Sequence, residues 1–292
     1  MAIHSRLLHN GQILEASAPL LHAGQLGLLA GWGVFTTLRI QDGFPFAWER
    51  HWARLTKDAR LLNVEMPARP EEIYNDLLRL VHANGKPNCT LRLNIVRNGG
   101  GMWEDRSSFR QASDVIALTG DSKQWGESVR LSIEPRARYA ASEFAGAKIL
   151  SWAQNLTWAE RAQRAGFDET ILLNEHDRVA ECTSANIFAV CGCEVRTPPL
   201  TEGCLPGITR EVLLNEIRLP DVRIVEHTLS ISDLLAAESA FITSSTRDLL
   251  RISEIEGQPV GNRGEIRERL SAAFRDFVNA DILRRKPMAL SA

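Results

Sequence analysis

The sequence lacks any apolar stretch long enough to cross a bilayer, and it lacks a strong excess of either charge. Its 292 residues include 34 Lys and Arg and 36 Asp and Glu, and neither sign is clustered. Nucleic acids and membranes are therefore not expected partners. The N-terminal residues also lack the continuous apolar segment of a secretory signal, which favours a cytoplasmic protein. A hydrophobic content of 44% is typical of a globular chain, and small molecules are the default partners.

Cysteine is scarce and irregularly placed. Five cysteines scattered through a chain of this length do not form the disulfide framework of a small secreted protein. Cys191 and Cys193 are separated by one glycine, but no second pair stands at the spacing of zinc ligands. We therefore expect reduced thiols and no metal site.

Several well-known catalytic signatures are missing as well. The chain has no G-x-S-x-G nucleophile elbow, no G-x-x-x-x-G-K-[ST] phosphate loop and no H-E-x-x-H zinc motif. Gly31-Trp32-Gly33 lacks the third glycine of a dinucleotide-binding fingerprint. The chemistry must therefore be sought in less common patterns.

The N-terminal part of the chain alternates predicted strands with amphipathic helices. Residues 33–40 are β-branched and alternate in polarity, and a turn predicts a hairpin to a second strand at 44–47. Apolar residues recur at helical spacing in 49–62 and 71–83, and residues 90–97 alternate again as a strand. These patterns predict an α+β arrangement.

The length and a change of pattern predict two domains. A polar, glycine-bearing stretch interrupts the periodic segments, so we expect a small N-terminal α+β domain at 1–119, a linker at 120–126 and a larger C-terminal domain at 127–292. In the second domain, a helix is predicted at 152–165, and a hairpin is predicted from the strands on either side of residues 174–177. The expected fold class is a two-domain α+β or α/β protein.

Two stretches are suited to binding an anion. Leu205-Pro206-Gly207 leads directly into a helical pattern, and a helix N-terminus presents free N–H groups to a phosphate. The alternative is a plain capped helix. Residues 241–246 form a strand that runs into a cluster of hydroxyl groups, which suits phosphate or carboxylate oxygens but also fits a solvated turn.

Three charged residues stand in unusual or ambiguous places. Lys148 lies among small and apolar residues, where burial lowers the pKa of an amine and prepares it for Schiff-base chemistry, although a lysine can also reach the surface from such a place. Glu181 lies within the otherwise apolar strand pattern of 179–188, and an unpaired buried carboxylate is costly. Arg54, on the polar side of its helix, is by default a surface charge.

Taken in order, these segments resemble the class IV aminotransferases, the pyridoxal phosphate enzymes of fold type IV. This family includes branched-chain and D-amino acid aminotransferases and 4-amino-4-deoxychorismate lyase. The resemblance runs from about residue 5 to residue 260. Five motifs carry it: residues 33–39 with 43–46 and 51–55, Lys148 ahead of 165–169, residues 179–188, residues 205–210 and residues 243–246.

The resemblance implies a fold, a cofactor and a role for each motif. It implies a larger C-terminal domain with a β-barrel-like core, as in D-amino acid aminotransferase, and a homodimer. Lys148 would be the catalytic Schiff-base lysine, and Glu181 would pair with the pyridine nitrogen of pyridoxal 5′-phosphate. The cofactor phosphate would be held by Arg54, the backbone N–H groups of Ile208 and Thr209, and Ser245.

The substrate is less clearly indicated. Where the family often has tyrosine and aspartate just before its first motif this chain has Ala30 and Trp32, and Ser151-Trp152 replaces the usual Asn-Tyr pair. Arg97, at a strand end, is a candidate for the substrate carboxylate, with an ordinary surface arginine as the alternative. Thr37 and Arg39 are further candidates for the substrate pocket.

Three functions are compatible with these motifs. The first, which we expect, is an aminotransferase that moves an amino group between a branched-chain or D-amino acid and a 2-oxo acid. The second is 4-amino-4-deoxychorismate lyase, which yields 4-aminobenzoate and pyruvate and is favoured by Phe35-Thr36-Thr37 and Glu181-Cys182. The third, a non-catalytic ligand-binding relative, predicts loss of Lys148 or Glu181, yet both are present.

Overall fold

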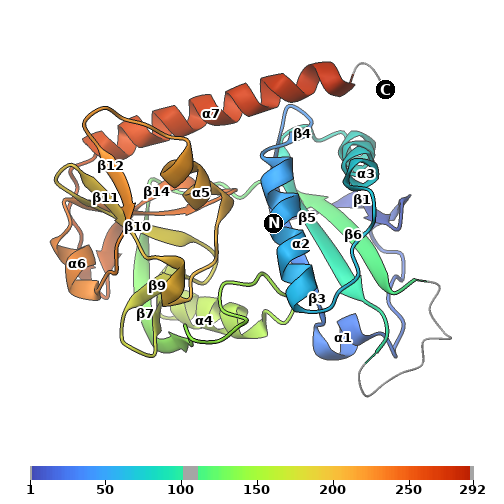
Figure 1. The fold of residues 1–292 in the computed structure, drawn as a ribbon, viewed down its shortest axis with the longest axis horizontal. Helices are drawn as coiled ribbons and strands as arrows, with labels where there is room; N and C mark the ends of the chain where they lie inside the picture. The colour runs from blue at the N-terminus through green and yellow to red at the C-terminus, as the bar shows by residue number, and fades with distance from the viewer. Residues whose placement is uncertain (1, 101–110, 290–292) are drawn as a thin grey trace. The chain divides into compact units, whose positions relative to one another are not determined.

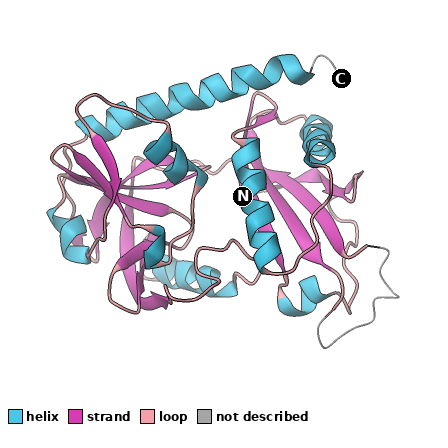
Figure 2. Ribbon diagram, in the orientation of Figure 1, coloured by secondary structure: helices cyan, strands magenta, loops and turns pink. Residues whose placement is uncertain are grey.

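The computed structural model describes residues 2–100 and 111–289, which form two compact units (Figures 1 and 2). The first unit comprises Met1–Lys123, Lys148–Trp152 and Val278–Ala292, and the second comprises Gln124–Ala147 and Ala153–Phe277. The first unit thus takes in two segments that are distant from it in sequence. The expected domain boundary at 120–126 stays a prediction.

The first unit is built on an antiparallel sheet with strand order β2-β1-β6-β5-β3-β4. Helices α2 and α3 supply the apolar side chains that pack with those of the sheet in one core. The elements of this unit are β1 (Ile3–His9), β2 (Gln12–Glu15), α1 (Leu26–Ala30), β3 (Gly33–Gln41), β4 (Phe44–Pro45), α2 (Trp48–Leu61), α3 (Pro70–Asn84), β5 (Cys89–Arg97) and β6 (Ser113–Gly120).

Local sequence explains where these elements begin and end. Helix α3 has Pro70 at its first position, where a missing N–H costs nothing, and acidic residues in its first turn. It ends at Gly85, whose φ of 61° lies in the left-handed region that glycine adopts freely. The predicted helices at 49–62 and 71–83 are confirmed within one residue at each end.

Strand β3 has two distinct faces. Val34, Leu38 and Ile40 pack into the core with the helices, as the alternation of side chains along a strand requires. Thr36 lies on this same face, whereas Phe35 and Thr37 alternate onto the opposite one. The faces of β3 therefore separate a helix-covered side from a side that carries polar and aromatic residues.

The second unit is built on a mixed sheet with strand order β12-β11-β10-β13-β14-β7-β8-β9, and β15 pairs with β14. Strands β7 and β14 are parallel, as are β7 and β8, whereas β10 and β13 are antiparallel. The elements are β7 (Ser128–Arg138), α4 (Ala153–Arg164), β8 (Glu169–Asn174), β9 (Val179–Cys182), β10 (Asn186–Cys191), β11 (Glu194–Thr197), the 3₁₀ helix η2 (Leu200–Glu202), α5 (Ile208–Asn215), β12 (Arg223–Glu226), α6 (Ile231–Ala236), β13 (Ser239–Ser244), β14 (Asp248–Ile255), β15 (Gln258–Pro259) and the first part of α7 (Glu265–Ala289). The part of α7 from Val278 onward belongs to the first unit.

This second sheet is strongly curled. Only a short turn separates β9 from β10, although β13, β14, β7 and β8 stand between these two strands in the sheet. The N–H of Cys182 also donates to the carbonyl of Ala185 across that turn, at 2.8 Å. The sheet must curve to bring its strands together in this way, so the expected β-barrel-like core is confirmed.

The core of the second unit is apolar and densely packed. Strand β8 is buried at every position, and all but the last residues of β10 and β13 are buried as well. The rings of Phe188 and Phe241 are stacked, with centroids 5.1 Å apart. A rigid scaffold therefore supports the turns at the ends of these strands.

In the described part of the chain, no helix is both long and apolar enough to cross a membrane. The same residues contain no group of three or more His, Cys, Asp or Glu side chains that could hold a metal ion.

Candidate active site

Lys148 is held in the first unit by its backbone. Its carbonyl accepts a hydrogen bond from the N–H of Phe35 at 3.1 Å, and its own N–H donates to Asp58 at 3.1 Å. The N–H of Leu150 donates in turn to the carbonyl of Gly33 at 2.9 Å. A Cβ on Gly33 would lie 2.5 Å from Leu150 and 2.4 Å from the carbonyl oxygen of Ile95, so glycine permits this close approach. The lysine is thus fixed between β3 and α2.

The amine of Lys148 lies in an aromatic corner. Nζ is 4.6 Å from the ring centre of Phe35 and 5.3 Å from that of Trp152, and the two rings meet edge to face at 5.6 Å. Trp152 is one of the four residues, with Ala30, Trp32 and Ser151, at which the sequence departs from the pattern of the family it resembles. An apolar, aromatic wall excludes water from one side of the amine while its ring faces attract positive charge.

Arg54 is buried in the structure, with 9% of its surface exposed, although its place in the helix pattern suggested a surface charge. Its Nη2 donates to the hydroxyl of Thr36 at 3.1 Å. His51, one helical turn earlier, shares a hydrogen bond of 2.7 Å with the same hydroxyl. Arg54 is therefore directed toward β3 by a partner that lies outside its own helix.

The electrostatic setting of this cluster is positive. Burial lowers the pKa of His51 well below its usual value, and the charges of Arg54 and Lys148 lower this pKa further. His51 is therefore neutral and can accept the hydrogen bond from the Thr36 hydroxyl. Burial raises the pKa of Asp58, against the lowering effect of the hydrogen bond from the Lys148 N–H.

The three residues expected to meet the substrate do not lie together. Thr37 and Arg39 are half-buried on β3, on the same face as Phe35. Arg97 is at the end of β5, where its Nε donates to the carbonyl of Gly99 at 3.1 Å and its guanidinium lies 4.2 Å from the ring centre of Trp32. Arg97 is thus bound to its own loop and to an aromatic side chain.

Arg92 is a further candidate residue that the sequence reasoning did not name. It is directly opposite Thr37 in the β3–β5 register, and its guanidinium lies 3.7 Å from the ring centre of Phe35. The amine of Lys148 lies 4.6 Å from the centre of the same ring. The two cationic groups are therefore neighbours at Phe35. Burial lowers the pKa of Arg92 to about 10. The alternation of 90–97 and the pairing with β3 were the signals that could have identified it.

Glu181 lies in β9 of the second unit and is buried, with 7% of its surface exposed. One carboxylate oxygen accepts hydrogen bonds from Nε and Nη2 of Arg138 on β7, at 3.2 and 3.1 Å. The other accepts from the backbone N–H of Leu205 at 3.0 Å. This carboxylate is therefore charge-compensated, and a burial that looked anomalous in the sequence has a physical explanation.

The stretch around Ile208 and Thr209 begins helix α5, with Gly207 at the position before the helix and no side chain capping it. Asn186 donates to the carbonyl of Leu205 at 2.8 Å, and a Cβ on Gly207 would lie 1.9 Å from its side-chain oxygen. Asn186 is also in register with Thr243 of β13. The segment that leads into α5 and the end of β13 are thus joined through one residue, Asn186, by its side chain and its backbone pairing.

Ser245 is half-buried in the turn that follows β13. Because Asn186 contacts both Thr243 and Leu205, the two stretches expected to bind phosphate lie close together in this unit. The hydroxyl oxygens of Thr209 and Thr243 are buried and have no hydrogen-bond partner among the described residues. Buried polar atoms of this kind call for a partner, and the uncapped N-terminus of α5 carries a partial positive charge. The residues present therefore fit a phosphate group.

Residues 33–255 match the family model described as amino-transferase class IV. The chain belongs to the class IV aminotransferase family. It is 28% identical over 272 residues to a putative branched-chain-amino-acid aminotransferase of Methanocaldococcus jannaschii, a match that covers 92% of this chain and 94% of that one. It is also 28% identical to the aminodeoxychorismate lyase of Bacillus subtilis, which covers 91% and 92% of the two chains.

The fold agrees with this assignment. A crystal structure of the branched-chain aminotransferase from the archaeon Thermoproteus uzoniensis with norvaline is similar with a TM-score of 0.86 and 25% identity, covering 95% of this chain and 96% of that one. The expected fold type IV is therefore confirmed. Class IV aminotransferases are enzymes and use pyridoxal 5′-phosphate, as the sequence motifs predicted.

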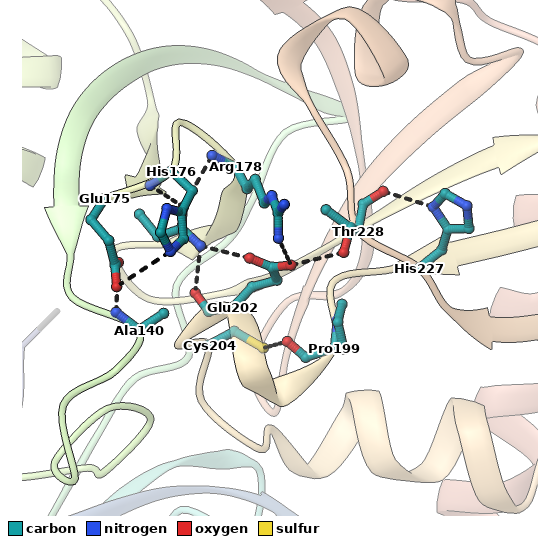
Figure 3. A network of polar contacts seen from close by, with 10 residues as sticks. Ala140, Glu175, His176, Arg178, Pro199, Glu202, Cys204, His227 and Thr228 are labelled. Carbon is teal, nitrogen blue, oxygen red and sulfur yellow. Dashed lines mark hydrogen bonds and ion pairs between the residues drawn. The ribbon is translucent and has the colours of Figure 1, made fainter.

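The second unit of this class IV aminotransferase also contains a polar network around the buried carboxylate of Glu202 (Figure 3). The carboxylate of Glu202 accepts hydrogen bonds from Asn174 at 2.7 Å and from Thr228 at 2.8 Å, and Arg178 lies 3.3 Å from it. The carboxylate of Glu175 accepts from the N–H of Ala140 at 2.8 Å. Glu202 stands three residues before Leu205, whose N–H donates to Glu181, so these contacts restrain the chain close to that donor.

The candidate residues of this class IV aminotransferase divide between the two units. Lys148, Arg54, Thr37, Arg39, Arg92 and Arg97 belong to the first unit, and Glu181, Ile208, Thr209 and Ser245 belong to the second. Within the first unit Lys148 and Arg92 meet at the Phe35 ring. Within the second, the stretches expected to bind phosphate meet through Asn186.

Proposed function

We propose that this enzyme transfers an amino group between an amino acid, of the branched-chain or D-amino acid type, and a 2-oxo acid. The observation that carries the proposal is the placement of Lys148, whose backbone is fixed on both sides and whose amine lies against Phe35 and Trp152. A lysine held in this way is a base and nucleophile with a defined position. The branched-chain relative and the similar fold support the choice of substrate.

Pyridoxal phosphate, when bound, supplies an electron sink for the bonds at the substrate α-carbon. We propose that its phosphate is held by Arg54, by the N–H groups of Ile208 and Thr209, and by Ser245. The buried hydroxyls of Thr209 and Thr243 add further donors to the second unit's part of this site. Donors fixed before binding lose little freedom when the anion arrives, and this preorganisation favours tight binding.

Lys148 is proposed to hold the cofactor covalently through Nζ and then to move a proton to and from the substrate α-carbon. Asp58 assists by accepting the backbone N–H of the lysine and so fixing its backbone. Neutral His51 binds the Thr36 hydroxyl and so leaves Arg54 as the buried cation of this cluster. The first unit therefore supplies both the base and a positive charge for an anionic ligand.

Glu181 is proposed to accept a hydrogen bond from the protonated ring nitrogen of the cofactor. Arg138 and the Leu205 N–H hold its carboxylate in place. A charge-assisted hydrogen bond to a ring N–H⁺ keeps that nitrogen protonated. Glu181 thus makes the bound ring a better acceptor of electrons.

For the substrate carboxylate we propose Arg92 in preference to Arg97. A guanidinium binds a carboxylate with two parallel hydrogen bonds, and the Nη1 and Nη2 groups of Arg92 make no hydrogen bond or ion pair with the residues described. We expect Arg92→Met to raise KM for carboxylate substrates roughly 10- to 100-fold, because a hydrogen bond to a charged group is worth about 1.5–3 kcal/mol. Steady-state kinetics beside Arg97→Met test this; equal KM values for the Arg92 variant and the wild type would reject it.

The lyase reaction is the second candidate. The similarity to the aminodeoxychorismate lyase of Bacillus subtilis favours it, as do the Phe35-Thr36-Thr37 and Glu181-Cys182 sequences. Lys148 and Glu181 would serve this reaction with the same roles.

Homodimer formation also stays a prediction, which the native mass of the purified protein would test.

A product assay separates the two reactions. Purified enzyme with pyridoxal phosphate is supplied with branched-chain L-amino acids or D-amino acids, with and without 2-oxoglutarate, and separately with aminodeoxychorismate. Amino transfer that requires the oxo acid is the expected result. Release of 4-aminobenzoate and pyruvate without any amino acceptor would instead establish the lyase and reject the transferase.

A further inference from the structure

A buried ion pair lies in the second unit beside the expected phosphate site. Glu169, the first residue of β8, is 3% exposed, and Arg247, in the turn between β13 and β14, has a side chain that is 8% exposed. Their charged groups are 3.1 Å apart. Removing two charges from water can cost more than their attraction returns, so a buried ion pair is weak evidence for a stabilising role and calls for another explanation.

Glu169 binds the turn that follows Glu181. One carboxylate oxygen accepts a hydrogen bond from the hydroxyl of Thr183, and the other accepts from the hydroxyl of Ser184 at 2.7 Å. Arg247 donates to the same Ser184 hydroxyl at 2.8 Å. The turn between β9 and β10 is therefore gripped by both members of the pair.

Arg247 also belongs to the turn that carries Ser245. Its N–H donates to the carbonyl of Ser244 at 3.2 Å, which closes this turn. The guanidinium lies 4.1 Å from the ring centre of Trp125, a stacking that arginine makes and lysine cannot reproduce. The turn that follows β13 and carries Ser245, called the hydroxyl turn below, is thus fixed by Arg247 to the Trp125 ring and to Glu169.

The contacts continue to Glu181 itself. Asn155 donates to the carbonyl of Thr183 at 2.7 Å and accepts from Nη1 of Arg138 at 3.4 Å. Arg138 in turn donates to the Glu181 carboxylate. An unbroken series of polar contacts therefore runs from the residue proposed for the ring nitrogen to the turn proposed for the phosphate.

We infer that Glu169 and Arg247 are positioning residues that hold the hydroxyl turn at Ser245 and the turn after Glu181 at the spacing one cofactor molecule requires. The inference rests on the proposed function, because it presumes that pyridoxal phosphate binds to these turns. Neither residue need touch the cofactor. Their effect is to fix the distance between its two polar ends before it binds.

The test uses substitutions that remove the pair as a unit. Because a single substitution leaves a buried charge unpaired, the decisive variant is the double change Glu169→Gln with Arg247→Met, studied beside Arg247→Lys. The matched control is Arg164→Met, which removes the exposed ion pair to Glu160 on α4. Apoenzyme is titrated with pyridoxal phosphate by absorbance, the phosphorus NMR shift of the bound phosphate is recorded, and thermal unfolding of the apoenzyme monitors folding.

We expect the double variant to fold and to bind pyridoxal phosphate on the order of tenfold more weakly, as loss of a residue that holds a metal ligand weakens binding at metal sites. The phosphorus resonance of the bound cofactor should be displaced. Arg247→Lys should bind pyridoxal phosphate with an affinity between those of the double variant and the wild type. Arg164→Met should match the wild type. A folded double variant with wild-type affinity and an unchanged phosphorus shift would overturn the inference. If wild-type apoenzyme bound no pyridoxal phosphate, the proposed function would fall and the inference with it.

Discussion

At the scale of single residues, Glu181 shows how a buried charge can be explained by its partners. Arg138 and the Leu205 N–H satisfy its carboxylate within the protein, and the ring nitrogen of the cofactor is the proposed third partner. We expect Glu181→Gln to keep the cofactor bound covalently at Lys148 but to slow exchange of the substrate α-proton by about 10²-fold, since only the electron sink is weakened. Proton exchange in D₂O, followed by NMR, measures this. A variant with the wild-type exchange rate would remove the role assigned to Glu181.

His51 makes stability depend on pH. Its pKa in the folded protein is lowered well below the usual 6.5 by burial and by Arg54, Lys148 and Arg285, so the folded state binds fewer protons than the unfolded state in this window. The stabilising contribution of neutral His51 is complete above the unfolded pKa and is lost as pH falls from there toward the folded pKa. Unfolding free energies of wild type and His51→Gln between pH 8 and about pH 5 should diverge, with the variant less pH-dependent. Parallel curves would assign the pH dependence to other groups.

The residue roles were only partly accessible from sequence. Residue by residue, Lys148 and Arg54 were ambiguous, and only the resemblance to a family gave them functions. The burial of Arg54 could not be read from its helix, because its partner Thr36 lies on a strand. Arg138 as the partner of Glu181 and Arg247 as the partner of Glu169 were not predicted, since both depend on contacts between segments far apart in the chain.

At the scale of secondary structure, the start of α5 depends on a glycine for space rather than for backbone freedom. Gly207 has a φ of −68°, which any residue adopts, but an added Cβ would lie 1.9 Å from the Asn186 side chain. We expect Gly207→Ala to displace Asn186 from the Leu205 carbonyl, to lower stability by about 1–3 kcal/mol and to weaken cofactor binding. Denaturant unfolding and titration with pyridoxal phosphate measure the two effects.

Gly24→Ala is the matched control, because a Cβ at Gly24 would meet no atom within 4 Å. That variant should be neutral in both measurements. If Gly207→Ala were equally neutral, the contact between Asn186 and Gly207 would not be what positions the helix start.

Secondary structure was largely predictable where periodicity is strong, as in α2, α3 and β3. The C-terminal helix α7 was not predicted, although Leu270, Phe274, Val278 and Ile282 are buried and recur at every fourth residue. Near its end, Asp281 accepts the N–H of Ala47 at 2.9 Å and so caps α2 from a distant segment. Such a cap has no signal in the local sequence of α2, which lacks a capping side chain of its own.

At the scale of the whole molecule, the order of the motifs along the chain predicted the family and the fold type, and both are confirmed. The curl of the second sheet could not be derived from periodicity, because it depends on the parallel pairing of β7 with β14 across a long stretch of chain. Alternating patterns state which residues face the core but not which strands are neighbours. The assignment of Lys148–Trp152 to the first unit was hidden for the same reason.

The central claim is that Lys148 holds pyridoxal phosphate, and covalent capture tests it most directly. Apoenzyme is mixed with the cofactor, reduced with borohydride and digested, and the modified peptide is located by mass spectrometry. We predict one modified lysine, Lys148, in the wild type and in Lys57→Ala, which replaces an exposed lysine of α2. Lys148→Ala should carry no fixed cofactor and should lack activity. Capture of the cofactor by Lys148→Ala, or its attachment to a different lysine in the wild type, would contradict the account.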